Sequence, residues 1–293
     1  MYLYGVLCVV LACTLSSFGV NLQKKSHSIS NMYVQCVVFL SGVACTICSA
    51  CFDFIALYFM SQLQLGIVGS LGLILNAVIS QKGFREKMNK KQRIGLILIV
   101  VGILCGVYGT YTTHHKASLS AWNTSQARVV ICINIVILHA LYISTVWSES
   151  FVPVGAMTGL FASMMVFFAK YVTTASSSHL EYNEQIFIAI LLVLFSGGAH
   201  LYFYNVALTR GKASTVVPVH QLFWLLGCLF YGTFALSQSI PNTTYTILST
   251  IVGMLLCGSG IAIYFSDKSE TRKIQYAHIA TVNNLPLQTA IGT

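Results

Sequence analysis

The chain has 293 residues, of which 56% are hydrophobic and 8% are charged, and its formal net charge is +9. Soluble domains carry about 25% charged residues, so this composition excludes a soluble globular protein and indicates a membrane protein. The positive charge does not indicate nucleic-acid binding, because the basic residues lie in short loops between apolar runs.

Nine apolar runs are long enough to cross a bilayer, whose hydrocarbon core needs about 20 residues of helix. They cover about 2–22, 33–58, 63–81, 94–113, 129–147, 152–174, 186–208, 214–236 and 245–265. We therefore expect one transmembrane domain over 1–266 and a disordered cytoplasmic tail over 267–293. The first run has its basic pair after it and none before it, which predicts a retained helix and not a cleaved signal peptide.

The basic residues also predict the orientation. Lys and Arg concentrate in the loops of one side, above all between residues 82 and 93, whereas the other side has only Lys116, Arg128 and Lys170. By the positive-inside rule, the amino terminus is outside or lumenal and the carboxyl terminus is cytoplasmic. Two glycosylation sequons, at Asn123 and Asn242, fall on the outer side, although each lies close to a span, which makes the signal weak.

Short motifs recur in the two halves of the chain. The sequence SFGVNLQK at 17–24 matches SMMVFFAK at 163–170, and VGILCG at 101–106 matches VGMLLCG at 252–258. The pattern predicts repeat 1 over about 1–113, a connector helix over about 129–147 and repeat 2 over about 152–266. Matching spans are an odd number apart, so the repeats are inverted in the membrane, as in many transporters. The expected fold is an all-α membrane protein of nine transmembrane helices, with two inverted four-helix units joined by a connector.

Asp53 is an acid well inside an apolar run. A charge at mid-bilayer costs about 2.5–3.5 kcal/mol on insertion scales and usually marks a functional site. Ser49 shares its helix face, and Ser17 and Asn76 lie on polar faces of the neighbouring spans. The sequence predicts a substrate or ion site at Asp53, Ser49, Ser17 and Asn76. Two alternatives stay open: small residues that let helices pack closely, and a structural hydrogen bond to Asp53.

In the second half, Asn205, Pro218 and His220 are the candidate site residues. Pro218 removes a helical hydrogen bond and frees a carbonyl group, which membrane proteins tolerate where it lines a cavity. His200 and Asn205 are five positions apart, about 140° around a helix, so both cannot point at one ligand. Lys170 is expected to extend toward the membrane interface.

Cys45, Cys48 and Cys51 form a C-x-x-C-x-x-C pattern, which is typical of a metal site but also of a closely packed helix face. No nucleophile–base pair, H-E-x-x-H motif or phosphate-binding loop occurs in the sequence. We therefore expect no enzyme activity and no cofactor. A tyrosine-based sorting pattern at Tyr276–Ile279 makes the plasma membrane or an endosomal membrane the expected location.

The sequence resembles the NIPA-type magnesium transporters of the drug/metabolite transporter superfamily. The segments that carry the resemblance are ALYFMSQLQLGIVGSLGLILNAVIS, GFREKMNKKQRIGLILIVVGILCGVYG and HLYFYNVALTRGKASTVVPVHQLFW. The chain departs from the family in its second span, where Ala50 stands at the position of the family's Glu and Asp53 stands at or near that of its Asn. The acid is thus displaced by one turn on much the same helix face.

The resemblance implies transport of Mg²⁺, and of other divalent cations, with Mg²⁺ as the transported substrate. We expect Asp53 to be the main cation ligand. Mg²⁺ is held through one or two carboxylates and keeps several waters, which suits a single buried acid. The expected partners are the lipid bilayer and the divalent cation, and the sequence leaves a homodimer open. The alternatives are a transporter of a small organic solute in the same superfamily, and a non-transporting receptor or scaffold.

Overall fold

The computed structural model describes residues 2–84, 89–110, 125–177, 184–211, 213–236 and 244–265. Within these ranges the chain is helical and contains no strand, and nine of its helical segments are long and apolar enough to cross a membrane. The expected all-α fold with nine spans is therefore confirmed for the described residues. Asn123, Asn242, Tyr276 and the tail 267–293 lie outside them.

The described residues of the first half form five helices. They are α1 (Tyr2–Ser26), α2 (Met32–Phe59), α3 (Gln62–Gly69), α4 (Leu71–Phe84) and α5 (Lys90–Thr110). Asn31 caps the start of α2, because its side chain accepts hydrogen bonds from the backbone N–H groups of Tyr33 and Val34. Met60 is the C-cap of α2 and has an extended backbone conformation. The next residue, Ser61, is the N-cap of α3, and it forms a capping box with Gln64.

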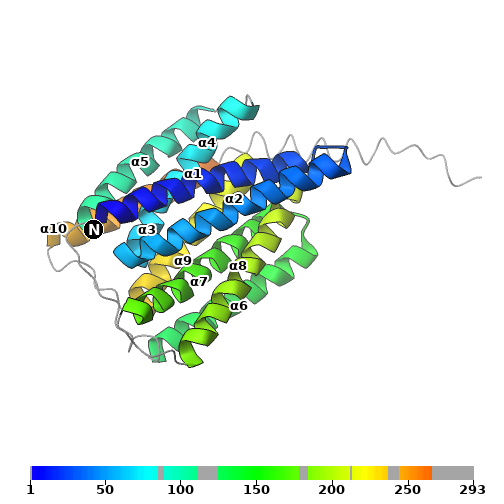
Figure 1. Cartoon of the computed structure of the whole chain (residues 1–293). Coiled ribbons are helices and arrows are strands. Elements are labelled where there is room, and N and C mark those ends of the chain that lie inside the picture. The colour runs from blue at the N-terminus through cyan, green and yellow to red at the C-terminus, as the bar shows by residue number, and fades with distance from the viewer. Residues whose placement is uncertain are drawn as a thin grey trace, which may run out of the picture.

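The second half follows a similar order. Its elements are α6 (Ser125–Trp147), α7 (Phe151–Ser177), α8 (Glu184–Arg210), α9 (Ala213–Phe230), the π-helical turn η2 (Tyr231–Ala235) that continues α9, and α10 (Thr244–Phe265). Figure 1 shows α1 and α2 running side by side, α6, α7 and α8 gathered on one side, and α5 and α10 on the other. The helix pairs α1–α2, α7–α8, α7–α9 and α5–α10 pack most closely.

The third span was expected as one helix, but it is broken at Ser70 into α3 and α4. The Ser70 N–H bonds to the Ile67 carbonyl at 3.2 Å, and the Leu73 N–H bonds to the Ser70 carbonyl at 3.2 Å. These three-residue bonds tighten the backbone locally, and the glycines on either side, Gly69 and Gly72, leave room for it. The break lies in the middle of the bundle, which positions it for the site described below.

The core of the bundle is formed by α3–α4, α7 and α9. In the span of α7, 83% of the residues are buried, against 11% in α2, so α7 is a central helix and α2 faces outward on most of its circumference. Large apolar side chains are exposed along the outer helices, for example Leu40 on α2, Leu104 on α5 and Leu194 on α8. In a bilayer these side chains contact lipid, so their exposure is expected.

The pair α5–α10 forms a close helix crossing. Gly95, Gly102 and Gly109 recur at every seventh position of α5, and Gly253 and Gly260 do so on α10. A Cβ atom on Gly102 would lie 2.7 Å from the backbone oxygen of Gly253. Small residues permit this approach, because no side chain separates the two backbones.

Candidate functional site

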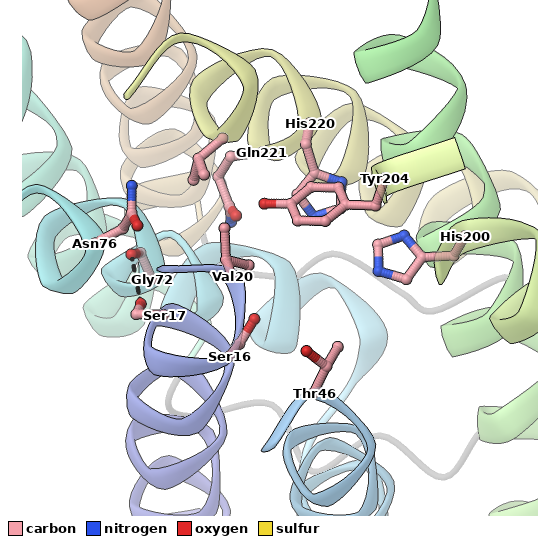
Figure 2. A pocket seen from close by; sticks show the side chains of 11 residues that line it. Ser16, Ser17, Val20, Thr46, Gly72, Asn76, His200, Tyr204, His220 and Gln221 are labelled. Carbon is pink, nitrogen blue, oxygen red and sulfur yellow. Dashed lines mark hydrogen bonds between the residues drawn. The ribbon is translucent and has the colours of Figure 1, made fainter. Parts of the chain in front are cut away.

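A cavity of about 670 Å³ lies between the two halves of the chain, bounded by α1, α2, α3, α4, α7, α8 and α9. Its polar lining is Cys13, Ser16, Thr46, Ser49, Asp53, His200, His220 and Gln221. A smaller pocket of about 50 Å³ continues it and adds Ser17, Asn76 and Tyr204. Figure 2 shows that the side chains of Ser16, Thr46, Tyr204, His200 and His220 face this shared space from α1, α2, α8 and α9.

Asp53 lies on the cavity wall, one turn after Ser49 on α2. Its side chain is half-buried and has no hydrogen bond or ion pair to any other residue that the structure describes. Ser49 is buried, and its hydroxyl also has no described partner. A carboxylate removed from bulk water is stable only when paired or solvated, and no described residue pairs with Asp53, so its carboxylate depends on whatever occupies the cavity.

The helix break supplies backbone carbonyls to the same wall, and side chains from other spans bind them. The Gly69 carbonyl accepts a hydrogen bond from Gln221 Nε2 at 3.1 Å, and the Gly72 carbonyl accepts one from Ser17 Oγ at 3.2 Å. Asn21 Nδ2 donates to Asn76 Oδ1 at 2.9 Å. These bonds fix α1 and α9 against the break, and they leave Asn76 at the edge of the smaller pocket.

On the opposite wall, the rings of His200 and His220 lie with their centres 5.2 Å apart, and Tyr204 packs against both. Thr158 on α7 connects the histidines. His200 Nδ1 lies 3.1 Å from the Thr158 carbonyl oxygen, and His220 Nδ1 lies 3.1 Å from Thr158 Oγ1. Three helices, α7, α8 and α9, thus meet at one polar cluster.

The rest of the cavity wall is apolar. Met165 and Val166 from α7, Phe54 from α2 and Trp224 from α9 line it. The Trp224 indole lies directly over Gly69, where a Cβ atom would collide with the ring. The cavity therefore combines one acid and one histidine cluster with a wide apolar surface.

Two lysines bind the ends of helices that belong to the other half. Lys170 on α7 was expected at the membrane interface, but it is buried and its Nζ donates to the Leu57 and Met60 carbonyls at 2.6 and 3.0 Å. Lys24 on α1 donates to the carbonyls of Leu208, at 2.5 Å, and Gly211, at 2.9 Å. In each case a lysine satisfies carbonyls at the carboxyl end of a helix, where positive charge is favourable.

The structure brings Asp53, Ser49, Ser17, Asn76 and His220 to one cavity system. It places two candidates elsewhere. Asn205 lies in a separate groove with Phe39 and Tyr202, and its Nδ2 donates to the Leu201 carbonyl within its own helix. Pro218 is buried inside α9 and does not line the cavity. Asn205 points away from His200, as the five-residue spacing predicts.

Sequence reasoning did not identify Ser16 and Trp224, which line the cavity, or Thr158, which contacts the two histidines. Ser16 differs from Ser17 by one position, so helical spacing alone would have included it had the helix rotation been known. Thr158 contacts His200 and His220 on two other helices, and spacing along a single helix cannot reveal such contacts. Trp224 is one turn after His220, and that spacing was the one available signal.

No group of three or more His, Cys, Asp or Glu side chains that could hold a metal ion occurs in the part of the chain that the structure describes. Cys48 and Cys51 are exposed on α2, and Cys45 is half-buried. The metal-site interpretation of the C-x-x-C-x-x-C pattern is thus not supported by the placement of these thiols. Cys51 instead lies at the rim of the large cavity.

The chain is similar to two curated proteins of one family. It is 21% identical to NIPA-like protein 2 of Mus musculus over 289 residues, which cover 92% of this chain and 75% of that protein. It is 20% identical to NIPA-like protein 2 of Homo sapiens, over 98% of this chain and 79% of that protein. This homology supports a NIPA-type family assignment. No family model matches the chain, and no solved structure matches it.

The NIPA-type similarity is weak but nearly full-length, so it extends over both halves and over the cavity between them. Together with the nine apolar helices of the described residues, it indicates a multi-pass membrane protein.

Proposed function

We propose that this NIPA-type protein is a membrane transporter that carries Mg²⁺, and other divalent cations, through the cavity at Asp53. The observation that carries the proposal is the unpartnered Asp53 carboxylate on the wall of a cavity of about 670 Å³ between the two halves. The family assignment supports transport, and the carboxylate supports a cation as the substrate.

The cavity suits an ion that keeps part of its water shell. Mg²⁺ gives up water reluctantly and is usually bound through one or two carboxylates, with waters in the remaining positions. Asp53 supplies one anionic ligand, the Ser49 hydroxyl adjoins it, and the volume leaves space for the retained waters. Weak, partly hydrated binding also favours release, which a transported ion requires.

The contacts between the halves support alternating access. Lys24 of the first half binds the end of α8, and Lys170 of the second half binds the end of α2. The two matched lysines of the sequence repeat thus make reciprocal contacts at opposite ends of the α1–α2 hairpin. The α5–α10 crossing is reciprocal as well, with Gly102 against Gly253 at its centre. We infer that the halves are inverted repeats that move relative to each other around the cavity.

One observation favours a second candidate, an organic cation. The cavity is far larger than an ion, and Met165, Val166 and Trp224 give it an apolar wall. Ile47 and Leu194, which also line it, are exposed on the outer surface, so the cavity reaches the lipid-facing side between α2 and α8. A hydrophobic amine could enter there, with its charge on Asp53 and its body on Trp224.

The test is Mg²⁺ uptake by proteoliposomes that contain the wild-type protein, Asp53→Asn or the control Glu149→Gln. Glu149 is exposed in the loop between α6 and α7, so its replacement is the same chemical change outside the cavity. A lost charge-assisted contact is worth about 1.5–3 kcal/mol, which predicts roughly a tenfold or greater loss of uptake at low Mg²⁺ for Asp53→Asn alone.

Normal Mg²⁺ uptake by Asp53→Asn would contradict the assignment of Asp53. Wild-type protein that fails to carry Mg²⁺ but accumulates a lipophilic amine, in a manner that depends on Asp53, would replace the cation proposal with the second candidate.

A further inference from the structure

Thr158 fixes the tautomer of both His200 and His220. The hydroxyl of Thr158 donates its single proton to the Gly155 carbonyl at 2.7 Å, so it can only accept from His220 Nδ1. The Thr158 carbonyl oxygen can only accept as well, here from His200 Nδ1. Both neutral imidazoles therefore carry their proton on Nδ1, and both Nε2 atoms present a lone pair.

The two Nε2 atoms have no hydrogen-bond partner among the described residues. Both rings line the large cavity as well as the small pocket, so these lone pairs face solvent-accessible space. Figure 2 shows the Tyr204 and Ser16 hydroxyls directed toward the same space, and neither hydroxyl has a described partner. Polar atoms inside a protein are usually bonded to a protein group or to an ordered water, so these acceptors are available to a ligand or a water in the cavity.

The distance between the two ring centres is compatible with a shared metal ion. Two imidazoles on a tetrahedral Zn²⁺, each bound through nitrogen at about 2.0–2.1 Å, have ring centres roughly 5 Å apart. The observed separation is 5.2 Å, with the ring planes inclined by 40°. Thr158 also provides what metal-binding histidines usually have, an acceptor for the second ring nitrogen that fixes the tautomer.

We propose that His200 and His220 form a second cation subsite, which binds a borderline transition-metal ion such as Zn²⁺ through the two Nε2 atoms. Tyr204, Ser16 and water are available for the remaining positions. The inference deepens the proposed cation transport, because it assigns a second class of substrate to the same cavity. Imidazole nitrogen suits Zn²⁺, Co²⁺ and Ni²⁺, whereas Mg²⁺ takes oxygen ligands such as Asp53.

Two protein ligands fit a transported metal ion better than a structural one. A structural zinc site is closed by four protein ligands, but this cluster supplies two nitrogens from α8 and α9. An ion held by two histidines keeps open positions for water and can leave when the helices move. Asp53 and the histidine pair therefore give one cavity two subsites with different metal preferences.

The first measurement uses wild-type protein in lipid nanodiscs, with exposed thiols alkylated to suppress zinc binding by cysteine. Zn²⁺ is added at one equivalent, and X-ray absorption fine structure reports its ligands. We expect the multiple-scattering signature of two imidazoles, with nitrogen and oxygen neighbours and no sulfur. A spectrum without imidazole, or with sulfur alone, would overturn the proposal without any variant being made.

The second measurement is Co²⁺ binding, followed by the visible absorption of the tetrahedral ion. The double variant His200→Asn/His220→Asn should lose this signal. The control His139→Asn, on an exposed position of α6, should keep it. Thr158→Val retains both rings but removes the hydroxyl that orients His220, and we expect about 10–100-fold weaker binding. This single variant keeps the test available if the double variant does not fold.

The same variants separate this inference from the proposed Mg²⁺ transport. If His200→Asn/His220→Asn loses Co²⁺ binding and Zn²⁺ uptake but still carries Mg²⁺, the subsite is confirmed as distinct from Asp53. If Co²⁺ binding is identical in wild-type and double-variant protein, the histidines are packing residues and the inference fails, whatever Asp53→Asn does to Mg²⁺ uptake.

Discussion

Lys170 shows how a charged residue is accommodated inside this bundle. Its ammonium group has no described acidic partner and binds two backbone carbonyls at the end of α2. Those carbonyls belong to the last turn of a helix, where they lack intrahelical partners. Lys170 thus donates the hydrogen bonds that water would otherwise give to these carbonyls. The favourable interaction of its positive charge with the helix end offsets part of the cost of burying the ammonium group.

Replacement of Lys170 by Met should destabilise the protein. The methionine fills a similar volume but leaves the Leu57 and Met60 carbonyls without a donor, which costs about 1–3 kcal/mol. The matched control is Lys25→Met, because Lys25 is exposed at the end of α1. SDS-driven unfolding in mixed micelles should show an earlier transition for Lys170→Met alone. Equal transitions would mean that water satisfies these carbonyls.

At this scale, helical spacing predicted the cavity residues of the first half. Ser49 and Asp53 share one face because they are one turn apart, and both line the cavity. In the second half, spacing alone could not decide which of His200 and Asn205 faces inward, because that depends on the rotation of α8 in the bundle. Packing against α7 decides it, since Thr158 binds His200 and leaves Asn205 on the outer side.

At the scale of elements, the spans were predictable because hydrophobic length is set by the bilayer. The break between α3 and α4 was not, because Gly69, Ser70 and Gly72 occur within a run that is apolar enough along its length to read as one continuous span. The break depends on tertiary contacts, in which Trp224 lies over Gly69 and Gln221 binds its carbonyl. A propensity-based prediction has no access to these contacts.

The α5–α10 crossing gives a prediction for a pair of elements. Gly102→Ala places a methyl group 2.7 Å from backbone atoms of α10, so the helices must separate, at a cost of about 1–3 kcal/mol. Gly258→Ala on α10 is the control, because nothing lies within 4 Å of a Cβ atom there. It should be neutral, or stabilising by up to about 1 kcal/mol through helix propensity.

Both glycine variants can be compared in the same SDS-unfolding measurement. The expected order of stability is Gly258→Ala at or above wild type and Gly102→Ala below it. The reverse order would show that the α5–α10 contact does not hold the two halves together.

At the scale of the whole molecule, the two lysine contacts lie at opposite ends of the bundle. Lys24 binds the end of α8 near the α1–α2 turn, and Lys170 binds the end of α2 at the other end of that hairpin. If the halves alternate in access, each lysine holds one end closed. The basic loops predict that the Lys24 end is cytoplasmic, so the two contacts oppose each other across the membrane.

Opposite changes in access to the cavity are therefore expected from Lys24→Met and Lys170→Met. The reporter is Ser16→Cys, because Ser16 lines the cavity. The native cysteines are first replaced, because thiols such as Cys13 and Cys51 also line the cavity and would react. In right-side-out vesicles, Lys170→Met should raise the labelling of this cysteine by a membrane-impermeant thiol reagent, and Lys24→Met should lower it. Hydrogen bonds to a charged group are worth about 1.5–3 kcal/mol, which predicts changes of roughly tenfold or more. Lys25→Met should leave the rate unchanged. Changes of the same sign in both lysine variants would instead indicate a continuous pore, because a channel has no reciprocal pair of ends to close.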